Sequence, residues 1–520
     1  MDKETQRANL HKAIWSIVED LRGSVDGWDF KSYVLGFLFY RFISENLCDF
    51  IRAREGVEYD TIDDAQAIGS KDALVKLKGF YIAPSELFSS IHARARQGGQ
   101  ALEGLNLLLH NALRNIEASC EGAESAEQFK GLFDELDMHS NKLGTSTLEK
   151  NKKLLQIMDS IAKLELGFQN NEMDAFGDAY EFLMSMYASN AGKSGGEFFT
   201  PQEVSELLAQ ITLHNNPTPN KVYDPCCGSG SALLQYQKLL STEPHLGYFG
   251  QEVNLTSFNL CRMNMLLHNV AYHKIHIAHG DVLLHPSPKH KEQEPFDAIV
   301  SNPPYSTKWI GKDDPLLIND DRFSKAGILA PKSYADFAFI LHMLSWLSQK
   351  GSAAIVCFPG IFYRGGAEKH IRTYLVENNF IDAIIALPEN LFFGTNIATY
   401  ILVLKKNKTT QDILFIDATK DFIKVGKDNK LSPANRAHIL SLYTAPSTTP
   451  HISTLASIEA IRANDYNLSV SSYVEKEDTR EKIDITLLNA QIKDIVARQS
   501  ALRVELDSII SSLEGTQEEG

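Results

Sequence analysis

The tetrapeptide Asn302-Pro303-Pro304-Tyr305 directly follows the apolar run FDAIV and combines residue types that can handle a planar amine. Proline lacks an N–H and has a fixed φ, so two prolines make a stiff corner at a strand end. The side-chain oxygen of Asn302 and the carbonyl of Pro303 can both accept hydrogen bonds from one NH2 group. They would draw its nitrogen toward tetrahedral geometry and aim its lone pair at an electrophile, which is catalysis by positioning and electrostatics. Tyr305 offers a ring on which a flipped-out base can stack.

A second candidate site is the glycine loop in VYDPCCGSGSALL, which is typical of a strand, a tight turn and a helix start. Its small residues are Gly228, Ser229, Gly230 and Ser231. The glycines allow close approach of a ligand, and the serines can donate hydrogen bonds. Leu233 occupies the third glycine position of a phosphate-binding loop and no lysine follows, which argues against nucleoside triphosphates. The loop suits a nucleoside with a small zwitterion, with Asp224 meeting its ammonium group.

Acidic residues follow the next two apolar runs, Glu252 in FGQEVN and Asp281 in HGDV. An acidic residue about 20 positions beyond such a loop commonly binds ribose hydroxyls. Asp281 can accept from an exocyclic amino group. Ligands of parallel sheets bind outside the carboxyl ends of the strands, so these residues should converge with Asp224 and Asn302. S-adenosylmethionine is the ligand that fits this combination best.

The elements that must position these residues are short apolar runs alternating with helical stretches. The runs are KVYDP, GYFGQE, KIHIAHGD, FDAIVSNP, SAAIVCFPG, IDAIIALPE and TYILVLKK. This alternation predicts an α/β fold with a largely parallel, doubly wound, Rossmann-like sheet. Helical periodicity from Asn9 to about Leu166 predicts an N-terminal all-helical domain.

The end of the chain predicts a single helix from about Ile483 to Leu513. Apolar residues recur in it at alternating four- and three-residue spacing: Leu488, Ile492, Ile495, Leu502, Leu506, Ile509 and Leu513. Such a seam is typical of a coiled coil, and a helix packing back on its own domain is the alternative. We expect a helical domain over 1–165, a catalytic domain over 166–443, a linker and extended segment over 444–480, and a partner-binding helix over 481–520.

Composition limits the function classes. The 520 residues are 43% hydrophobic and carry a formal charge of −15, which indicates a globular chain without a broad nucleic-acid-binding face of its own. The six cysteines lack paired spacing, so neither disulfides nor a metal site is expected, and Cys226 and Cys227 are interpreted as small packing residues. No signal peptide is evident, and the run YVLGFLFYRFI is shorter than the ~20 residues of a membrane span. These features predict a cytoplasmic protein.

Longer stretches resemble the modification subunits of type I restriction–modification systems, which are adenine-N6 DNA methyltransferases. Besides DPCCGSG and NPPY, the stretches are GDAYEFLMSMYASNAGKSGGEFFTPQEV, LRGSVDGWDFKSYVLGFLFYRFISE and RANDYNLSVSSYV, so the resemblance spans nearly the whole chain. It implies methyl transfer from S-adenosylmethionine to a flipped-out adenine, with Asn302 to Tyr305 catalytic. It also implies cofactor contacts from Ser229 to Ser231, from Glu252, and from Glu197, Phe198, Phe199, Thr200, Pro201 and Gln202.

The resemblance further implies partners: a specificity subunit that reads double-stranded DNA, a restriction subunit, and two copies of this chain per specificity subunit. Phe392 or Phe393, in ENLFFGTNIATY, is a candidate second wall for the flipped base, with core packing as the alternative. Methylation of a protein glutamine or of cytosine N4 uses the same clamp chemistry. A non-enzymatic scaffold should have lost the clamp or the glycine loop, and both are present.

Overall fold

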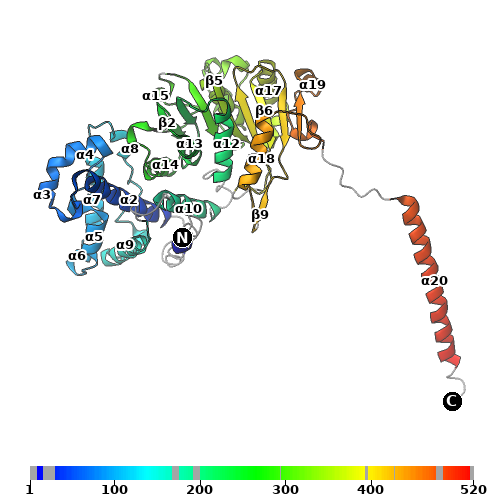
Figure 1. The fold of residues 1–520 in the computed structure, drawn as a ribbon, viewed down its shortest axis with the longest axis horizontal. Coiled ribbons are helices and arrows are strands. Elements are labelled where there is room, and N and C mark those ends of the chain that lie inside the picture. The colour runs from blue at the N-terminus through cyan, green and yellow to red at the C-terminus, as the bar shows by residue number, and fades with distance from the viewer. Residues whose placement is uncertain are drawn as a thin grey trace. The chain divides into compact units, whose positions relative to one another are not determined.

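The computed structural model describes residues 9–15, 30–166, 175–190, 200–292, 294–392, 396–426, 428–475 and 484–515. Contacts divide the chain into two compact units, Met1–Val474 and Glu475–Gly520. The first unit contains a helical region followed by a nine-stranded sheet, and the second contains one long helix (Figure 1). Before Lys221 the described residues form no strand, which confirms the expected helical N-terminal region.

The helical region is built around a long, largely buried helix. Its helices are α2 (Phe30–Glu55), α3 (Asp64–Ala67), α4 (Lys71–Lys78), α5 (Phe88–Ala95), α6 (Gln100–Glu103), α7 (Leu105–Ser119), α8 (Ala126–Phe129), α9 (Thr147–Ala162) and α10 (Ala175–Asn190). From Tyr33 to Ser44 every side chain of α2 except Arg41 is buried. Arg41 donates through Nη1 to the carbonyls of Ile161 and Leu164, at 2.6 and 2.9 Å. These two bonds join α2 to the last turn of α9 and to the residues just beyond it.

All seven apolar runs identified in the sequence form strands of one sheet, and two further strands join it. The strands are β1 (Lys221–Asp224), β2 (Gly247–Glu252), β3 (Ile275–His279), β4 (Phe296–Ser301), β5 (Leu347–Cys357), β6 (Ile381–Ala386), β7 (Tyr400–Lys405), β8 (Ile413–Asp417) and β11 (Ser453–Ala456). Their order is β11-β8-β6-β7-β5-β4-β1-β2-β3. Strands β7 and β11 run antiparallel to their neighbours and the other pairs are parallel, so the expected largely parallel sheet is confirmed. A separate hairpin joins β9 (Ile423–Val425) to β10 (Asp428–Lys430).

Helices cover both faces of the sheet. They are α12 (Gln202–Asn215), α13 (Ser231–Leu239), α14 (Leu255–Leu267), α15 (Pro288–Lys291), α16 (Asp336–Trp346), α17 (Ala367–Glu377), α18 (Pro433–Thr444) and α19 (Ile458–Ala463). Val300 of β4 packs in the core that includes α12, α13 and α14, whereas Ile299 packs in the core that includes α16 and α17. Successive strand residues therefore bury on opposite faces, as in a doubly wound sheet.

The helical region shares its core with one face of the sheet. Arg262 of α14 is 2% exposed and donates through Nη1 to the carbonyls of Glu127, Gln128 and Lys130 at 2.9–3.2 Å. The hydroxyl of Tyr180 in α10 donates to the carbonyl of Leu260, also in α14. Helix α14 thus joins the helical region to the sheet (Figure 1).

The expected linker over 444–480 is wrong as far as Val474. Strand β11 within it pairs antiparallel with β8, and Leu468, Val470 and Val474 are buried. The Thr- and Ser-rich composition of this segment is typical of a loop, but β11 pairs at the edge of the sheet, where short strands are common. The compact unit therefore extends to Val474, and the division falls at Glu475.

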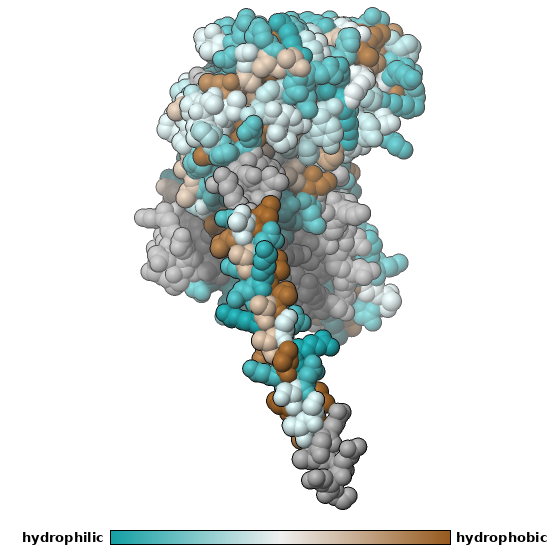
Figure 2. Space-filling view, turned by 90° about the vertical axis from the view of Figure 1, so that its right-hand side faces the viewer, coloured by the Kyte–Doolittle hydropathy of each residue, from teal (hydrophilic) through white to brown (hydrophobic). Residues whose placement is uncertain are grey.

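The second unit is the helix α20 (Ile485–Gly515), which begins where Asp484 accepts hydrogen bonds from the N–H groups of Thr486 and Leu487. All described side chains of α20 are exposed, among them the seven apolar residues of the seam. Figure 2 shows these hydrophobic side chains along the helix between polar ones. The helix is confirmed, and its coiled-coil pairing stays a prediction. In the described parts of the chain, no helix combines the length and apolar character of a membrane span.

Candidate active site

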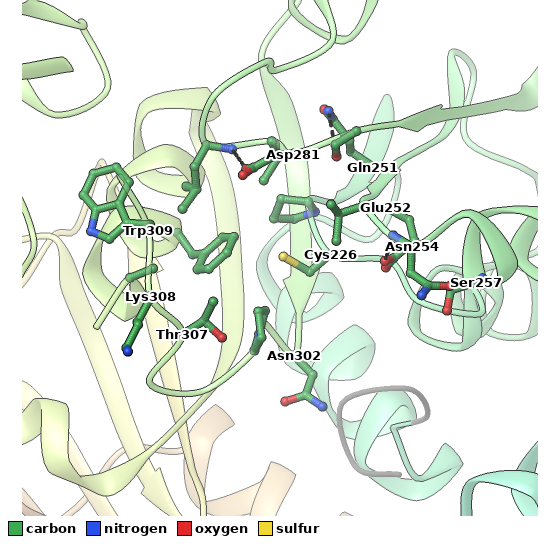
Figure 3. A pocket seen from close by; sticks show the side chains of 18 of the residues that line it. Cys226, Gln251, Glu252, Asn254, Ser257, Asp281, Asn302, Thr307, Lys308 and Trp309 are labelled. Atoms are coloured by element: carbon green, nitrogen blue, oxygen red, sulfur yellow. Dashed lines mark hydrogen bonds between the residues drawn. The ribbon is translucent and has the colours of Figure 1, made fainter. Parts of the chain in front are cut away.

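A cavity of 490 Å³ opens at the carboxyl ends of the first four strands (Figure 3). Glu252 ends β2, Asp281 lies just beyond β3, and Asn302 directly follows β4, and all three line the cavity. Its opposite wall includes Trp309 and Phe339. Three of the four strand-end residues predicted to converge therefore line one cavity, whereas Asp224 lines a smaller cavity together with the glycine loop and Asn302.

The glycine loop adopts a conformation that excludes larger residues. Gly230 has φ of +79°, and a Cβ there would lie 2.8 Å from the sulfur of Cys261. Ser231, 3% exposed, has a buried hydroxyl without a hydrogen-bond partner in the described parts of the chain. Such an atom is commonly satisfied by a water molecule or by a polar group of a bound ligand. The tight loop and this hydroxyl fit a small zwitterionic ligand.

Asp224, at the end of β1, is 3% exposed. Its Oδ1 accepts from the hydroxyl of Ser301 at 2.7 Å and from the N–H of Cys226 at 3.0 Å. Burial raises the pKa of Asp224 to about 7, although both hydrogen bonds act in the opposite direction. An ammonium group beside this carboxylate would stabilise its ionised form.

Cys226 and Cys227 do not have the environment of a nucleophile. Burial raises the pKa of the Cys226 thiol well above its usual range, and the nearby carboxylates of Asp224 and Glu252 add to the shift. A protonated thiol is unreactive. Cys227 is 5% exposed and packs beneath the loop, against Gly250 of β2.

The two acidic residues of the cavity are held by backbone N–H groups. Glu252 accepts through Oε2 from Gly228 at 3.0 Å and through Oε1 from Asn254 at 2.8 Å. Burial raises the pKa of Glu252 above its usual value. Asp281 accepts from the N–H of Leu283 at 2.8 Å, as drawn in Figure 3. Both carboxylates are thereby fixed at the cavity wall.

Asn302 is held by two hydroxyl groups. Its Nδ2 donates to Oγ1 of Thr200 at 3.1 Å, and its Oδ1 accepts from the hydroxyl of Tyr305 at 2.5 Å. The side chain is 9% exposed, so these bonds are not readily replaced by water. The side-chain oxygen Oδ1 of Asn302 has two lone pairs, so an amide oxygen of this kind can accept hydrogen bonds from two donors. Within the described chain, no group donates to the carbonyl of Pro303.

Asp336, which no motif in the sequence singles out, fixes the turn after the tetrapeptide. Ser306 has φ of +51°, and its N–H donates to both carboxylate oxygens of Asp336 at 3.2 Å. The next residue, Thr307, accepts from the N–H of Ala335 at 2.8 Å. Asp336 lies about 30 residues along the chain, at the start of α16, so no local pattern could have identified it.

A buried arginine supports the part of the cavity wall next to Asp281. Arg322 is 7% exposed and donates to the carbonyls of Val282 and Leu283 at 2.9 and 2.8 Å. Its charge is balanced by Asp320, whose carboxylate lies 2.7 Å from Nη2. Val282 and Leu283 line the cavity next to Asp281, so Arg322 fixes the backbone that carries them.

Other candidate residues lie elsewhere. Pro201 and Gln202 line a different cavity of 610 Å³, and Gln202 donates to Glu181. Phe392 is 4% exposed and packs in the core, which supports the alternative reading of this residue. Glu197, Phe198, Phe199 and Phe393 lie outside the described residues.

Two family models match the chain and together cover most of it. The model "N-6 DNA Methylase" matches residues 171–482, and the model "HsdM N-terminal domain" matches residues 10–161. The chain is also 47% identical to the type I restriction enzyme MpnII methylase subunit of Mycoplasma pneumoniae. That similarity covers 98% of this chain and 97% of the relative.

Solved structures give the same result. The type I restriction–modification methyltransferase subunit from Streptococcus thermophilus is 36% identical, with a TM-score of 0.82, over 91% of this chain and all of that one. A chain from a study of type I restriction–modification complex assembly is 17% identical with a TM-score of 0.61, over 98% of this chain and 99% of that one, which shows a common fold. These similarities favour adenine methylation over the glutamine and cytosine-N4 alternatives. The chain belongs to the N-6 DNA methylase family, among the methylase subunits of type I restriction enzymes.

Proposed function

We propose that the chain binds S-adenosylmethionine in the 490 Å³ cavity and methylates N6 of an adenine flipped out of DNA. The observation that carries this proposal is the position of Asn302, which lines the same cavity as Glu252 and Asp281 and also adjoins the glycine loop. The cofactor supplies the methyl group when bound. In this arrangement Glu252 holds the ribose hydroxyls and Asp281 the adenine amino group. Asp224 with Gly228 to Ser231, beside the smaller cavity that Asn302 also lines, holds the methionine part.

The tetrapeptide holds and orients the amine of the target base. The base NH2 donates to Asn302 Oδ1 and to the carbonyl of Pro303, while Pro304 keeps the corner rigid. The Tyr305 hydroxyl already donates to Asn302, so the arriving amine either shares this oxygen or replaces the hydroxyl. Tyr305 then stacks on the base. The hydrogen bond to Thr200 keeps the Asn302 amide in place during this exchange.

DNA is delivered by partners in this proposal. A chain with a formal charge of −15 has no general attraction for a duplex, yet its site must receive a base. We infer that a specificity subunit holds the DNA, that α20 pairs with helices of that subunit through its exposed seam, and that a restriction subunit joins the complex. Two copies of this chain per specificity subunit would let each copy methylate one strand.

The experiment is to co-purify the chain with the products of neighbouring genes and to map modified bases in DNA treated with the complex. We expect N6-methyladenine at one sequence and no N4-methylcytosine. The Asn302→Ala complex should still bind S-adenosylmethionine by calorimetry and should lose methyl transfer, because it lacks an acceptor used mainly in the transition state. Turnover near the wild-type rate in this variant would refute the clamp.

A further inference from the structure

The β9–β10 hairpin leaves apolar and basic side chains in solvent. All three residues of β9 are exposed, with Ile423 at 48% and Val425 at 45%. Phe422, just before the strand, is 37% exposed. The segment 420–430 reads KDFIKVGKDNK, with four lysines and two aspartates, in a chain whose overall charge is negative. Such a ribbon is not explained by packing within this chain.

Sheet topology places this hairpin on the catalytic side. Strand β8 runs parallel to β6, and the N–H of Ala418 donates to the carbonyl of Ala386 at 3.0 Å. Strands β6 and β5 are both antiparallel to β7, and β5 is parallel to β4. The carboxyl ends of β8 and β4 therefore lie at one edge of the sheet. The chain leaves β8 toward the hairpin at the edge where it leaves β4 toward Asn302.

Buried contacts hold the hairpin there. Asn429 of β10 belongs to the separate hairpin and not to the main sheet. It is 4% exposed and donates hydrogen bonds to the loop that follows β6. Its N–H donates to the carbonyl of Asn390 at 3.0 Å and its Nδ2 to that of Glu389 at 2.8 Å. Val425 and Lys430 line the 610 Å³ cavity together with Pro201, the neighbour of Thr200. The hairpin is thus anchored close to the residues that hold Asn302.

We propose that the β9–β10 hairpin contacts duplex DNA beside the target adenine. Lysines such as Lys424 would face phosphates, which provide most of the affinity of protein–DNA contacts. Ile423 and Val425 would cover base edges that become unstacked when the adenine leaves the helix, since apolar side chains commonly occupy such steps. A hairpin that combines lysines with β-branched side chains suits phosphates and unstacked base edges better than an acidic or a purely apolar hairpin would. This inference rests on the proposed DNA methylation.

The test uses the assembled complex and a fluorescent duplex containing the site mapped in the host genome. Two variants alter the hairpin, Ile423→Ser with Val425→Ser, and Lys424→Glu. The matched control makes the same kinds of change at the exposed pair Lys76→Glu and Leu77→Ser in α4. Anisotropy at several salt concentrations gives the DNA Kd and its salt dependence, and calorimetry gives the S-adenosylmethionine Kd.

We expect each hairpin variant to raise the DNA Kd by about tenfold, and Lys424→Glu to lower the salt slope by about one, the value of one phosphate contact. The control and the S-adenosylmethionine Kd should change less than twofold. An unchanged DNA Kd would overturn the proposal, and so would a hairpin variant that no longer co-purifies with its partners, because the surface would then bind protein. Failure of the wild-type complex to methylate adenine would instead refute the proposed function, and the DNA Kd comparison would still be measurable.

Discussion

Replacing Thr200 with valine should distinguish two possible roles of this residue, which are to position Asn302 and to contact the cofactor. Valine keeps the shape of the side chain but cannot accept the hydrogen bond from Nδ2 of Asn302, which spans 3.1 Å. Because Asn302 is 9% exposed, water replaces the lost partner poorly. An unsatisfied buried group costs about 1–3 kcal/mol. If that cost falls mainly on the transition state, the maximal rate should drop by about 5- to 150-fold.

The assay is methyl transfer by the assembled complex at saturating S-adenosylmethionine and DNA, with calorimetry for the cofactor. We expect a lower kcat with little change in the cofactor Kd, and recovery of most of the rate in Thr200→Ser, which restores the hydroxyl. The resemblance-based assignment of Thr200 as a cofactor contact predicts the reverse. A weakened cofactor Kd with normal kcat would refute the positioning role.

Three further outcomes follow from the site and the tail. Glu252→Ala should weaken S-adenosylmethionine binding by about 1–3 kcal/mol, because it leaves polar groups unpaired; an unaltered calorimetric Kd would exclude Glu252 from the ribose site. Since burial raises the pKa of Asp224 to about 7, the free protein protonates this carboxyl below that pH, whereas a bound ammonium group favours the ionised form. Affinity for the cofactor should therefore be level above about pH 7 and fall by up to about tenfold per pH unit below it, and Asp224→Asn should abolish this dependence in a calorimetric series. Deleting residues Lys482 to Gly520 should leave a folded, cofactor-binding protein that fails to co-purify with its partner. Each large aliphatic side chain of the seam contributes about 1.5–3 kcal/mol when it is buried, so losing all of them should abolish the interface. Normal assembly of the truncated protein would contradict the role of α20.

The sequence was sufficient to identify the strands that carry the candidate site. Runs such as FDAIV and SAAIV are continuous and apolar because both faces of the sheet are covered, which makes them easy to recognise. Glu252, Asp281 and Asn302 each stand at the end of such a run, and the rule that parallel strand ends converge was enough to bring them together.

Features that depend on distant parts of the chain could not be found this way. Asp336 and Arg322 act on backbone atoms of segments about 30 and 40 residues away, and neither interrupts a local pattern. Strand β11 lies in the segment predicted to be a linker, because its place in the sheet depends on pairing with β8 rather than on its own composition. The partner of Asn302 was also unforeseen: Thr200 was placed with the cofactor, and the structure shows its hydroxyl on the amide.

The hydrogen bonds from Arg262 of α14 to the helical region affect how this protein unfolds and where its chain can be divided. If the helical region separated, Nη1 of this buried guanidinium would lose the carbonyls of Glu127, Gln128 and Lys130, at a cost of several kcal/mol, while Nη2 would keep its bond to Oδ1 of Asn259. The helical region and the sheet should therefore melt in a single cooperative transition in scanning calorimetry. Chimeras with related subunits should tolerate a junction near Glu475, whereas a junction near Leu166 would leave α14 facing a surface it did not evolve with.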